Sequence, residues 1–301
     1  MTISMPHRID DSNLGNAFNY LFWVISEMEK TEDEEVVWDF DKTTLLPPVF
    51  LLPLMLYRHK CGKSITCVDL SESINDYFKI IRFDKGLRAD AFSEDELKKQ
   101  MDIFAAQTFI PMIDFPATRN KNDIRNAILD IVETILVKQL NIRGQIRTAL
   151  SYILAETIDN ITEHSCSDRG YIFAQYYPDK HYIDICIADN GITLLGSYVK
   201  NNCHDIIDDL DALKNACTGK STKNRPDAEN RGYGITTSKR MLVEGLNGMF
   251  FLFSGAAFHF MNKEGQSFVK LPKTIRWDGT IVALRIPYDE KKDFNYSQYI
   301  K

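Results

Sequence analysis

The 301-residue sequence lacks several patterns that would assign it to a class at once. Its six cysteines include no Cys-x-x-Cys pair, which argues against a zinc site and against a thioredoxin-like motif. It also lacks a basic surplus, with 36 Lys and Arg against 42 Asp and Glu, so nucleic-acid binding is not indicated. Internal repeats and low-complexity tracts are missing too, and 44% hydrophobic residues is the composition of an ordinary globular protein.

No segment of the sequence is suited to a membrane. The longest apolar run, Leu45 to Tyr57, is too short to span a bilayer and contains three prolines, so we expect it to be buried. The start of the chain shows no charged-then-apolar leader. Together with the unpaired cysteines, these features predict a cytoplasmic protein with reduced thiols.

The length favours two domains, at about 100–200 residues each. Short β-rich runs alternate with helical patterns after an N-terminal segment at 1–30, and this order predicts a small α/β domain at 31–115, including a connecting helix. We place the boundary near Pro116. The remaining residues, 116–301, are expected to form a second domain of helices and strands.

Periodicity and turn residues predict the elements along the chain. Helices are predicted at 17–30, 71–83, 93–107, 124–140 and 145–165, and Ser71 is the expected cap of the second of these. Two more are predicted, one within 41–63 and one that begins after the glycines at 231–234. The predicted strands lie at 34–40 and 64–70, in a hairpin over 170–189, and at 249–262, 267–272 and 280–287. The proline-marked stretch at 109–123 is expected to be connective, and the stretch at 196–231 is polar and rich in turn residues.

The predicted helix at 145–165 carries a polar row. Glu156, Asn160 and His164 follow at intervals of four residues and share a face, with Asp159 or Glu163 near its edge. A buried face with Glu and Asn is costly unless something satisfies it. Mg²⁺ with phosphate oxygens would satisfy the amide, and a water could bind the carboxylate. The alternative is a solvated helix face.

Three further motifs follow in order, each weak alone. They are Asp-Asn-Gly at 189–191 after a strand, Arg-Gly-Tyr-Gly at 231–234 opening a helix, and Asp-Gly-Thr at 278–280 before the last strand. A strand-end aspartate beside glycine can accept a hydrogen bond from an exocyclic amine. Glycines at a helix N-terminus can present backbone N–H groups to phosphate.

Taken in this order, the motifs resemble those of the GHKL ATPases, the family of gyrase B, Hsp90, MutL and histidine-kinase catalytic domains. ETIDNITEHS looks like the N box, IADNGI the first glycine box, RGYGITTSKRMLVE the second, and WDGTIVALRIP the closing strand. TGKSTK is similar to the lid segment of many members. The resemblance covers about residues 120–290 and implies an α+β fold, with a GHKL (Bergerat) α/β sandwich that binds ATP and Mg²⁺.

The resemblance also implies a role for each matched position. Glu156 would position or deprotonate the attacking water, and Asn160 would ligate Mg²⁺. The purine would be held by Asp189, Gly191 and, through water, Thr280. The phosphates would be held by residues of the second glycine box and of the lid over 196–231: Gly232, Gly234, with Tyr233 between them, and Lys223, Arg225 or Arg231.

The sequence departs from the family pattern in two ways. Thr193 stands where members commonly have a second glycine, which bears on the lid hinge and on turnover. No histidine precedes His164 in the helices from Asp123 onward, so a histidine autokinase is disfavoured. A P-loop at 219–222 is also rejected, because Lys214 stands where that motif needs glycine.

The N-terminal layer is similar in pattern to the STAS fold of anti-anti-sigma factors. In that comparison Thr43 and Thr44 carry the only hydroxyls of the loop that is phosphorylated in those factors. The alternative is a plain α/β protein-interaction domain.

Three hypotheses of function therefore stay open. The first is an ATPase whose nucleotide state regulates a protein partner, the second an anti-sigma-type serine/threonine kinase acting on a STAS-like partner, and the third a nucleotide sensor without hydrolysis. Many GHKL domains dimerise on binding ATP, so an ATP-dependent homodimer is a further expectation.

Overall fold

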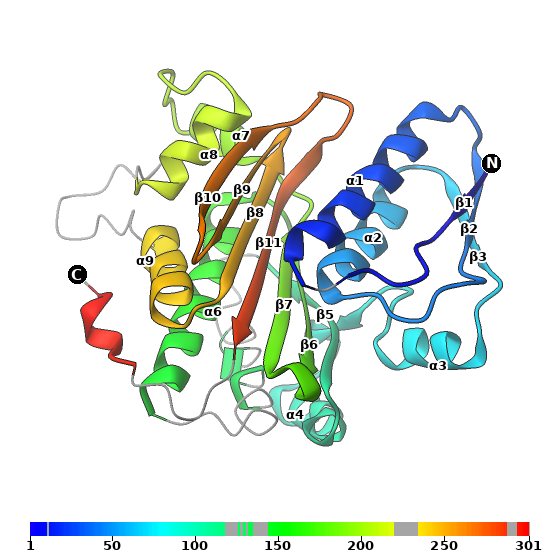
Figure 1. Ribbon diagram of the computed structural model, residues 1–301, viewed down its shortest axis with the longest axis horizontal. Coiled ribbons are helices and arrows are strands. Elements are labelled where there is room, and N and C mark those ends of the chain that lie inside the picture. The colour runs from blue at the N-terminus through cyan, green and yellow to red at the C-terminus, as the bar shows by residue number, and fades with distance from the viewer. Residues whose placement is uncertain are drawn as a thin grey trace.

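A computed structural model describes residues 1–10, 12–117, 126, 129–130, 132–134, 144–219, 234–287 and 294–300. The fold is α+β and contains two sheets (Figure 1). The N-terminal sheet has three parallel strands in the order β1-β2-β3. The larger sheet is mixed and has eight strands in the order β10-β9-β8-β11-β7-β6-β5-β4.

The N-terminal layer confirms the predicted alternation of strands and helices. Asn13 and Ser71 cap two of its helices by accepting hydrogen bonds from the backbone N–H groups of Gly15 and Ile74. Its elements are β1 (Thr2–Ser4), α1 (Leu14–Lys30), β2 (Glu35–Asp39), α2 (Pro48–Lys60), β3 (Ser64–Val68) and α3 (Glu72–Ile80). The first strand was not predicted, because three residues are too few to show a period.

The large sheet is antiparallel throughout, except for the pairing of β4 with β5. Its strands are β4 (Leu87–Arg88), β5 (Phe109–Pro116), β6 (Arg169–Tyr177), β7 (Tyr182–Asp189), β8 (Met249–Gly255), β9 (Ala257–Asn262), β10 (Gly265–Lys270) and β11 (Trp277–Pro287). The predicted hairpin is β6–β7, which turns at Pro178–Lys180. The last strand, β11, lies between β7 and β8 at the centre of the sheet.

Helices cover both faces of the large sheet. Figure 1 shows α1 and α2 on one side and α6 (Gly144–His164) and α9 (Gly234–Arg240) on the other. Strand β8 shows the division residue by residue: Phe251 and Phe253 pack on Phe18 and Phe22 of α1, whereas Phe250 and Leu252 face a pocket on the other side. The large-sheet region also contains the helices α4 (Glu94–Asp102), α7 (Leu194–Lys200) and α8 (Asp209–Cys217).

The two sheets share one apolar core. The main cluster of buried hydrophobic side chains runs from Ile3 to Phe294 without interruption between the layers. A buried ion pair lies within the large sheet, where Arg285 of β11 donates to both carboxylate oxygens of Asp184 of β7 at 2.7 and 2.8 Å. Among the described residues, no helix combines the length and apolarity that crossing a bilayer would require.

The prediction that 109–123 is connective was wrong over its first part, which forms the fully buried strand β5. Prolines suggested a connection, but Pro116 ends the strand, and Pro111 falls where the register between β5 and β6 shifts. A missing N–H disturbs the ladder least at these two places. The strand pairs with β6, so it belongs to the large sheet.

Two further element predictions need correction. The stretch 249–262, expected as one strand, is the hairpin β8–β9, which turns at Gly255 with φ of +61°. The stretch 196–231, for which the sequence predicted turns and no helix, contains most of α7 and all of α8 in its described part. The predicted helix at 124–140 falls largely outside the described residues.

Candidate functional site

The polar row of α6 faces a pocket. Glu156, Asn160 and His164 all line this pocket, and Asp159 and Glu163 lie beside them. The other side of the helix is apolar and buried against β6 and β7. The row therefore lies on one side of an amphipathic helix, where it faces a cavity lined by several other elements.

The rest of the pocket is formed by elements far apart in the sequence. The cavity has a volume of about 130 Å³, so a ligand much larger than one water molecule fits. Its walls are mostly apolar beyond the α6 row. They come from the β7–α7 turn and α7, from α8 and α9, and from the strands β8 and β11: Ile192, Thr193, Leu194, Ser197, Tyr198, Ala216, Gly234, Ile235, Ser238, Phe250, Leu252, Thr280 and Val282.

The start of α9 touches α6 at the polar end of the pocket. Gly234 is the first residue of α9, and a Cβ atom at this position would clash with the carboxylate of Glu156. The absence of a side chain lets the backbone lie directly against that carboxylate. The structure thus brings together two residues that the motifs of the N box and the second glycine box contain.

Asp189 ends β7 directly behind the pocket lining. Its side chain is buried, Oδ1 accepts a hydrogen bond from the Gly191 N–H at 2.8 Å, and Oδ2 has no partner among the described residues. Burial raises its pKa to about 7, although hydrogen bonds from Gly191 and Thr280 act in the opposite direction. Thr280 itself lines the pocket, so it links Asp189 to the lining.

The raised pKa of Asp189 predicts an unusual dependence of stability on pH. The unfolded chain ionises this group near pH 4, whereas the folded protein keeps its proton up to about pH 7. Between these pH values the folded state therefore binds more protons than the unfolded state. The contribution of Asp189 to the unfolding free energy falls as the pH rises from about 4 to 7. Asp189→Asn stays neutral at every pH. We therefore expect its unfolding free energy, relative to that of wild type, to be a few kcal/mol higher at pH 8 than at pH 5.

Urea unfolding of both proteins at the two pH values measures this difference. The comparison cancels the other titrating groups, since they are common to both chains. An identical change with pH in wild type and variant would contradict the assignment.

Gly191 is required by close packing between β7 and the end of α6. A Cβ at this position would clash with the carbonyl oxygen of Ser165, the residue that follows α6. The neighbouring Ile192 N–H donates to the same oxygen at 2.6 Å. The turn after β7 is therefore fixed to the end of the helix that carries the polar row.

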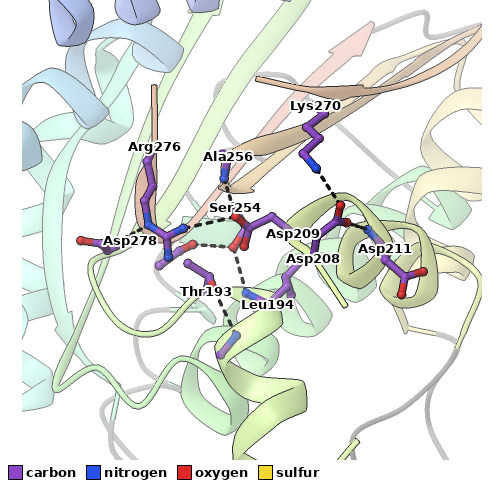
Figure 2. A network of polar contacts seen from close by, with 12 residues as sticks. Thr193, Leu194, Asp208, Asp209, Asp211, Ser254, Ala256, Lys270, Arg276 and Asp278 are labelled. Atoms are coloured by element: carbon purple, nitrogen blue, oxygen red, sulfur yellow. Dashed lines mark hydrogen bonds and ion pairs between the residues drawn. The ribbon is translucent and has the colours of Figure 1, made fainter. Parts of the chain in front are cut away.

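Thr193 has a local structural role. Its side chain caps α7 by accepting a hydrogen bond from the Gly196 N–H at 3.0 Å. The next residue, Leu194, donates its N–H to Ser254 Oγ, and that hydroxyl donates to the carbonyl of Gly279 at 2.7 Å (Figure 2). Ser254 thereby joins the start of α7 to β11.

A β-bulge at the start of β11 lies against Asp189. The register with β8 shifts between Trp277 and Thr280, and Gly279 there has φ of +95°. A Cβ on Gly279 would clash with the carbonyl oxygen of Asp189 and lie 2.6 Å from its Oδ1. The indole N–H of Trp277 donates to the same carbonyl at 3.0 Å. The bulge thus holds Asp189 from two sides.

Several residues chosen from the sequence are not placed by the structure. Lys223, Arg225, Arg231, Gly232 and Tyr233 lie outside the described residues, and so does the last third of the predicted lid, residues 220–231. Their roles stay predictions.

The threonines of the N-terminal loop are described. Thr43 is buried and donates to the carbonyl of Pro6, and the exposed Thr44 donates to that of His7. Both belong to the layer whose helices α1 and α2 pack on the face of the large sheet opposite the pocket. Neither hydroxyl therefore faces the pocket of its own chain.

Among the described residues, no group of three or more His, Cys, Asp or Glu side chains could hold a metal ion. A single amide such as Asn160 fits a cation that takes its other oxygen ligands from a bound phosphate and from water. The donor set therefore suits Mg²⁺ arriving with a phosphorylated ligand.

Sequence analysis missed three residues of this site. Ser254 and Trp277 hold Asp189 and β11 in place, and Ser238 lines the pocket with a buried hydroxyl that has no hydrogen-bond partner among the described residues. None of the three lies in a motif position that we had assigned a role. Their importance follows only from the packing of strands and a helix that are distant in the sequence.

No family model, no curated protein and no solved structure matches this chain.

Proposed function

We propose that the chain binds ATP with Mg²⁺ in this pocket, hydrolyses it slowly, and uses its nucleotide state to regulate contact with a protein partner. The observation that carries the proposal is the meeting of four separate segments. The α6 row, the end of β7, the start of α9 and the bulge of β11 lie up to 124 residues apart, from Glu156 to Thr280, and adjoin one pocket. They include described residues of the N box, of the first glycine box, of the second glycine box from Gly234 onward, and of the closing strand of the proposed resemblance.

The same resemblance supplies the finer proposal of fold. An antiparallel sheet with α6 and α9 on one face and the pocket between them supports a GHKL (Bergerat) sandwich. A parallel sheet with helices supports a STAS-like N-terminal layer. The domain boundary near Pro116 stays a prediction, although β5 pairs within the large sheet up to that residue.

The purine would bind at the end of the pocket formed by Thr280 and the turn after β7. No described residue donates to the buried Asp189 Oδ2, and an adenine amine would supply a donor. A charged acceptor makes this hydrogen bond roughly twice as strong as a neutral one. The apolar side chains Ile192, Leu252 and Val282 suit the faces of a planar base.

The phosphates would extend toward α6 and α9. Gly234 provides a helix start without a side chain, and Asn160 offers an amide oxygen to the metal. Mg²⁺, when bound, neutralises charge on the phosphate oxygens. Glu156 would accept the proton of a water that attacks the terminal phosphate, because its carboxylate lies at the point where both helices meet.

Titration calorimetry with Mg²⁺ and ATP tests the site, with phosphate release measured in parallel. We expect wild type to bind and Asp189→Asn to lose at least tenfold in affinity, because the amine then faces a neutral amide. We expect Asn160→Ala to lose the part of the affinity that depends on Mg²⁺.

The outcomes separate the hypotheses. Wild-type affinity in both variants would refute the assigned site. Binding without phosphate release would favour the sensor over the ATPase. A measurement of molecular mass with and without a non-hydrolysable analogue tests the expected ATP-dependent homodimer.

A further inference from the structure

The C-terminal end of α2 reaches from the N-terminal layer to the start of β11. Its last three residues are basic, and two of them bind within their own layer: Arg58 donates to the carbonyl of Ile65, and His59 contacts that of Asp84. Lys60 instead forms an ion pair with Asp278 Oδ2 at 2.7 Å. This ion pair joins residues 218 positions apart in the sequence.

Asp278 belongs to a chain of ion pairs that continues toward α8. Its other oxygen accepts from Arg276 Nε at 3.1 Å, and Arg276 Nη1 donates to Asp209 Oδ2 at 3.2 Å (Figure 2). Asp209 also accepts from the Ala256 N–H in the β8–β9 turn. Asp278 is therefore held between Lys60 on one side and the turn of the large sheet on the other.

Asp278 is also part of the bulge that contacts Asp189. It follows Trp277, which donates to the Asp189 carbonyl, and precedes Gly279, which lies against the Asp189 carboxylate. A shift of the bulge would therefore change the surroundings of Asp189. Through Asp278, the end of α2 acts on this bulge.

We propose that Lys60 is a positioning residue of the nucleotide site: through Asp278 it holds the 277–280 bulge against Asp189, and so couples the N-terminal layer to the purine contact. The inference rests on the proposed function, because it concerns the same site. It assigns a role in nucleotide binding to a residue outside every motif of the resemblance. It also gives the N-terminal layer a route by which a partner bound there would alter nucleotide affinity.

The charges around Asp189 support this coupling. Among the described residues, Lys60 on α2 acts on the Asp189 carboxyl through its charge, and its partner Asp278 also pairs with Arg276, the residue before β11. Burial raises the pKa of Asp189 to about 7, and the positive charge of Lys60 acts against this rise. Lys60 therefore favours the ionised carboxylate, which is the stronger acceptor for an amine.

The test is the pH profile of Mg-ADP binding, measured by calorimetry from pH 6 to pH 9. For Lys60→Met we expect affinity about threefold weaker near pH 7, the scale of an exposed ion pair, with the midpoint of the profile moved to higher pH. The two proteins should converge near pH 9, where Asp189 is ionised in both. Titration of the ligand is common to both proteins and does not affect the comparison.

Two variants control the experiment. Lys79→Met removes the same charge from the same layer, from a surface ion pair with Asp76, and should follow wild type. Lys60→Arg keeps the charge and should retain most of the affinity. A profile for Lys60→Met that coincides with wild type, while Asp189→Asn loses binding, would overturn the coupling and leave the proposed function standing. Full binding by Asp189→Asn would instead refute the proposed site, and the coupling with it.

Discussion

The Glu156→Gln variant is expected to release phosphate from ATP about 10²–10⁴-fold more slowly than wild type while binding Mg-ATP with similar affinity. Glutamine keeps the size of the side chain against Gly234, so the contact between α6 and α9 is preserved. It cannot accept a proton from water at neutral pH, and the proposed mechanism assigns that step to this position. Steady-state phosphate release and calorimetry on the same preparations measure the two quantities.

A matched control is available close to the same helix. Glu244 lies just after α9, is half-exposed, and pairs with Arg240, the last residue of that helix. Glu244→Gln should therefore leave both phosphate release and Mg-ATP affinity near wild type. If Glu156→Gln hydrolyses ATP at the wild-type rate, another group performs the proton transfer. If it loses binding along with hydrolysis, Glu156 serves the site mainly through structure.

The polar row of α6 could be predicted from sequence because its information is local. Side chains four residues apart lie on one side of a helix whatever the rest of the fold does. The same holds for the hairpin β6–β7, where two alternating runs flank a turn. For such elements the period of the sequence and the geometry of the backbone leave little freedom.

Strand β5 and the hairpin β8–β9 could not be predicted in the same way. Pro111 in β5 is tolerated because the register with β6 shifts at that point, which only the partner strand reveals. The turn at Gly255 is hidden in an apolar run and is bound by Asp209, which accepts the Ala256 N–H from 47 residues away. In both cases the deciding contact is distant in the sequence.

The site depends on distant contacts even more than the fold does. The bulge of β11 is held by Ser254 of β8 and Lys60 of α2, and neither residue has a local pattern that marks it. The motifs predicted that Asp189 and Thr280 belong to one site. They could not predict that the N-terminal layer would reach the same place, because that depends on how α2 packs on the second face of the sheet.

The Arg285→Met variant is expected to lose about 3–5 kcal/mol of unfolding free energy, the largest effect on stability that we predict. Arg285 is 5% exposed and Asp184 0%, so removing the cation leaves a carboxylate charged, or protonated at a cost, inside the sheet. The guanidinium also lies 4.0 Å from the centre of the Tyr182 ring, and this contact is lost as well. Urea unfolding monitored by circular dichroism gives the difference.

The double variant Asp184→Leu with Arg285→Met tests the physical reason. A buried ion pair replaced by apolar side chains of similar volume is often nearly neutral, so the double variant should be more stable than Arg285→Met alone. If the double variant loses as much unfolding free energy as Arg285→Met, or more, the attraction within the pair stabilises the sheet, and the cost of a buried charge left alone does not explain the loss. The result does not depend on the proposed function, because the pair lies at the opposite end of β7 from Asp189. It therefore tests the pairing of β7 with β11, on which the position of the bulge and of the pocket depends.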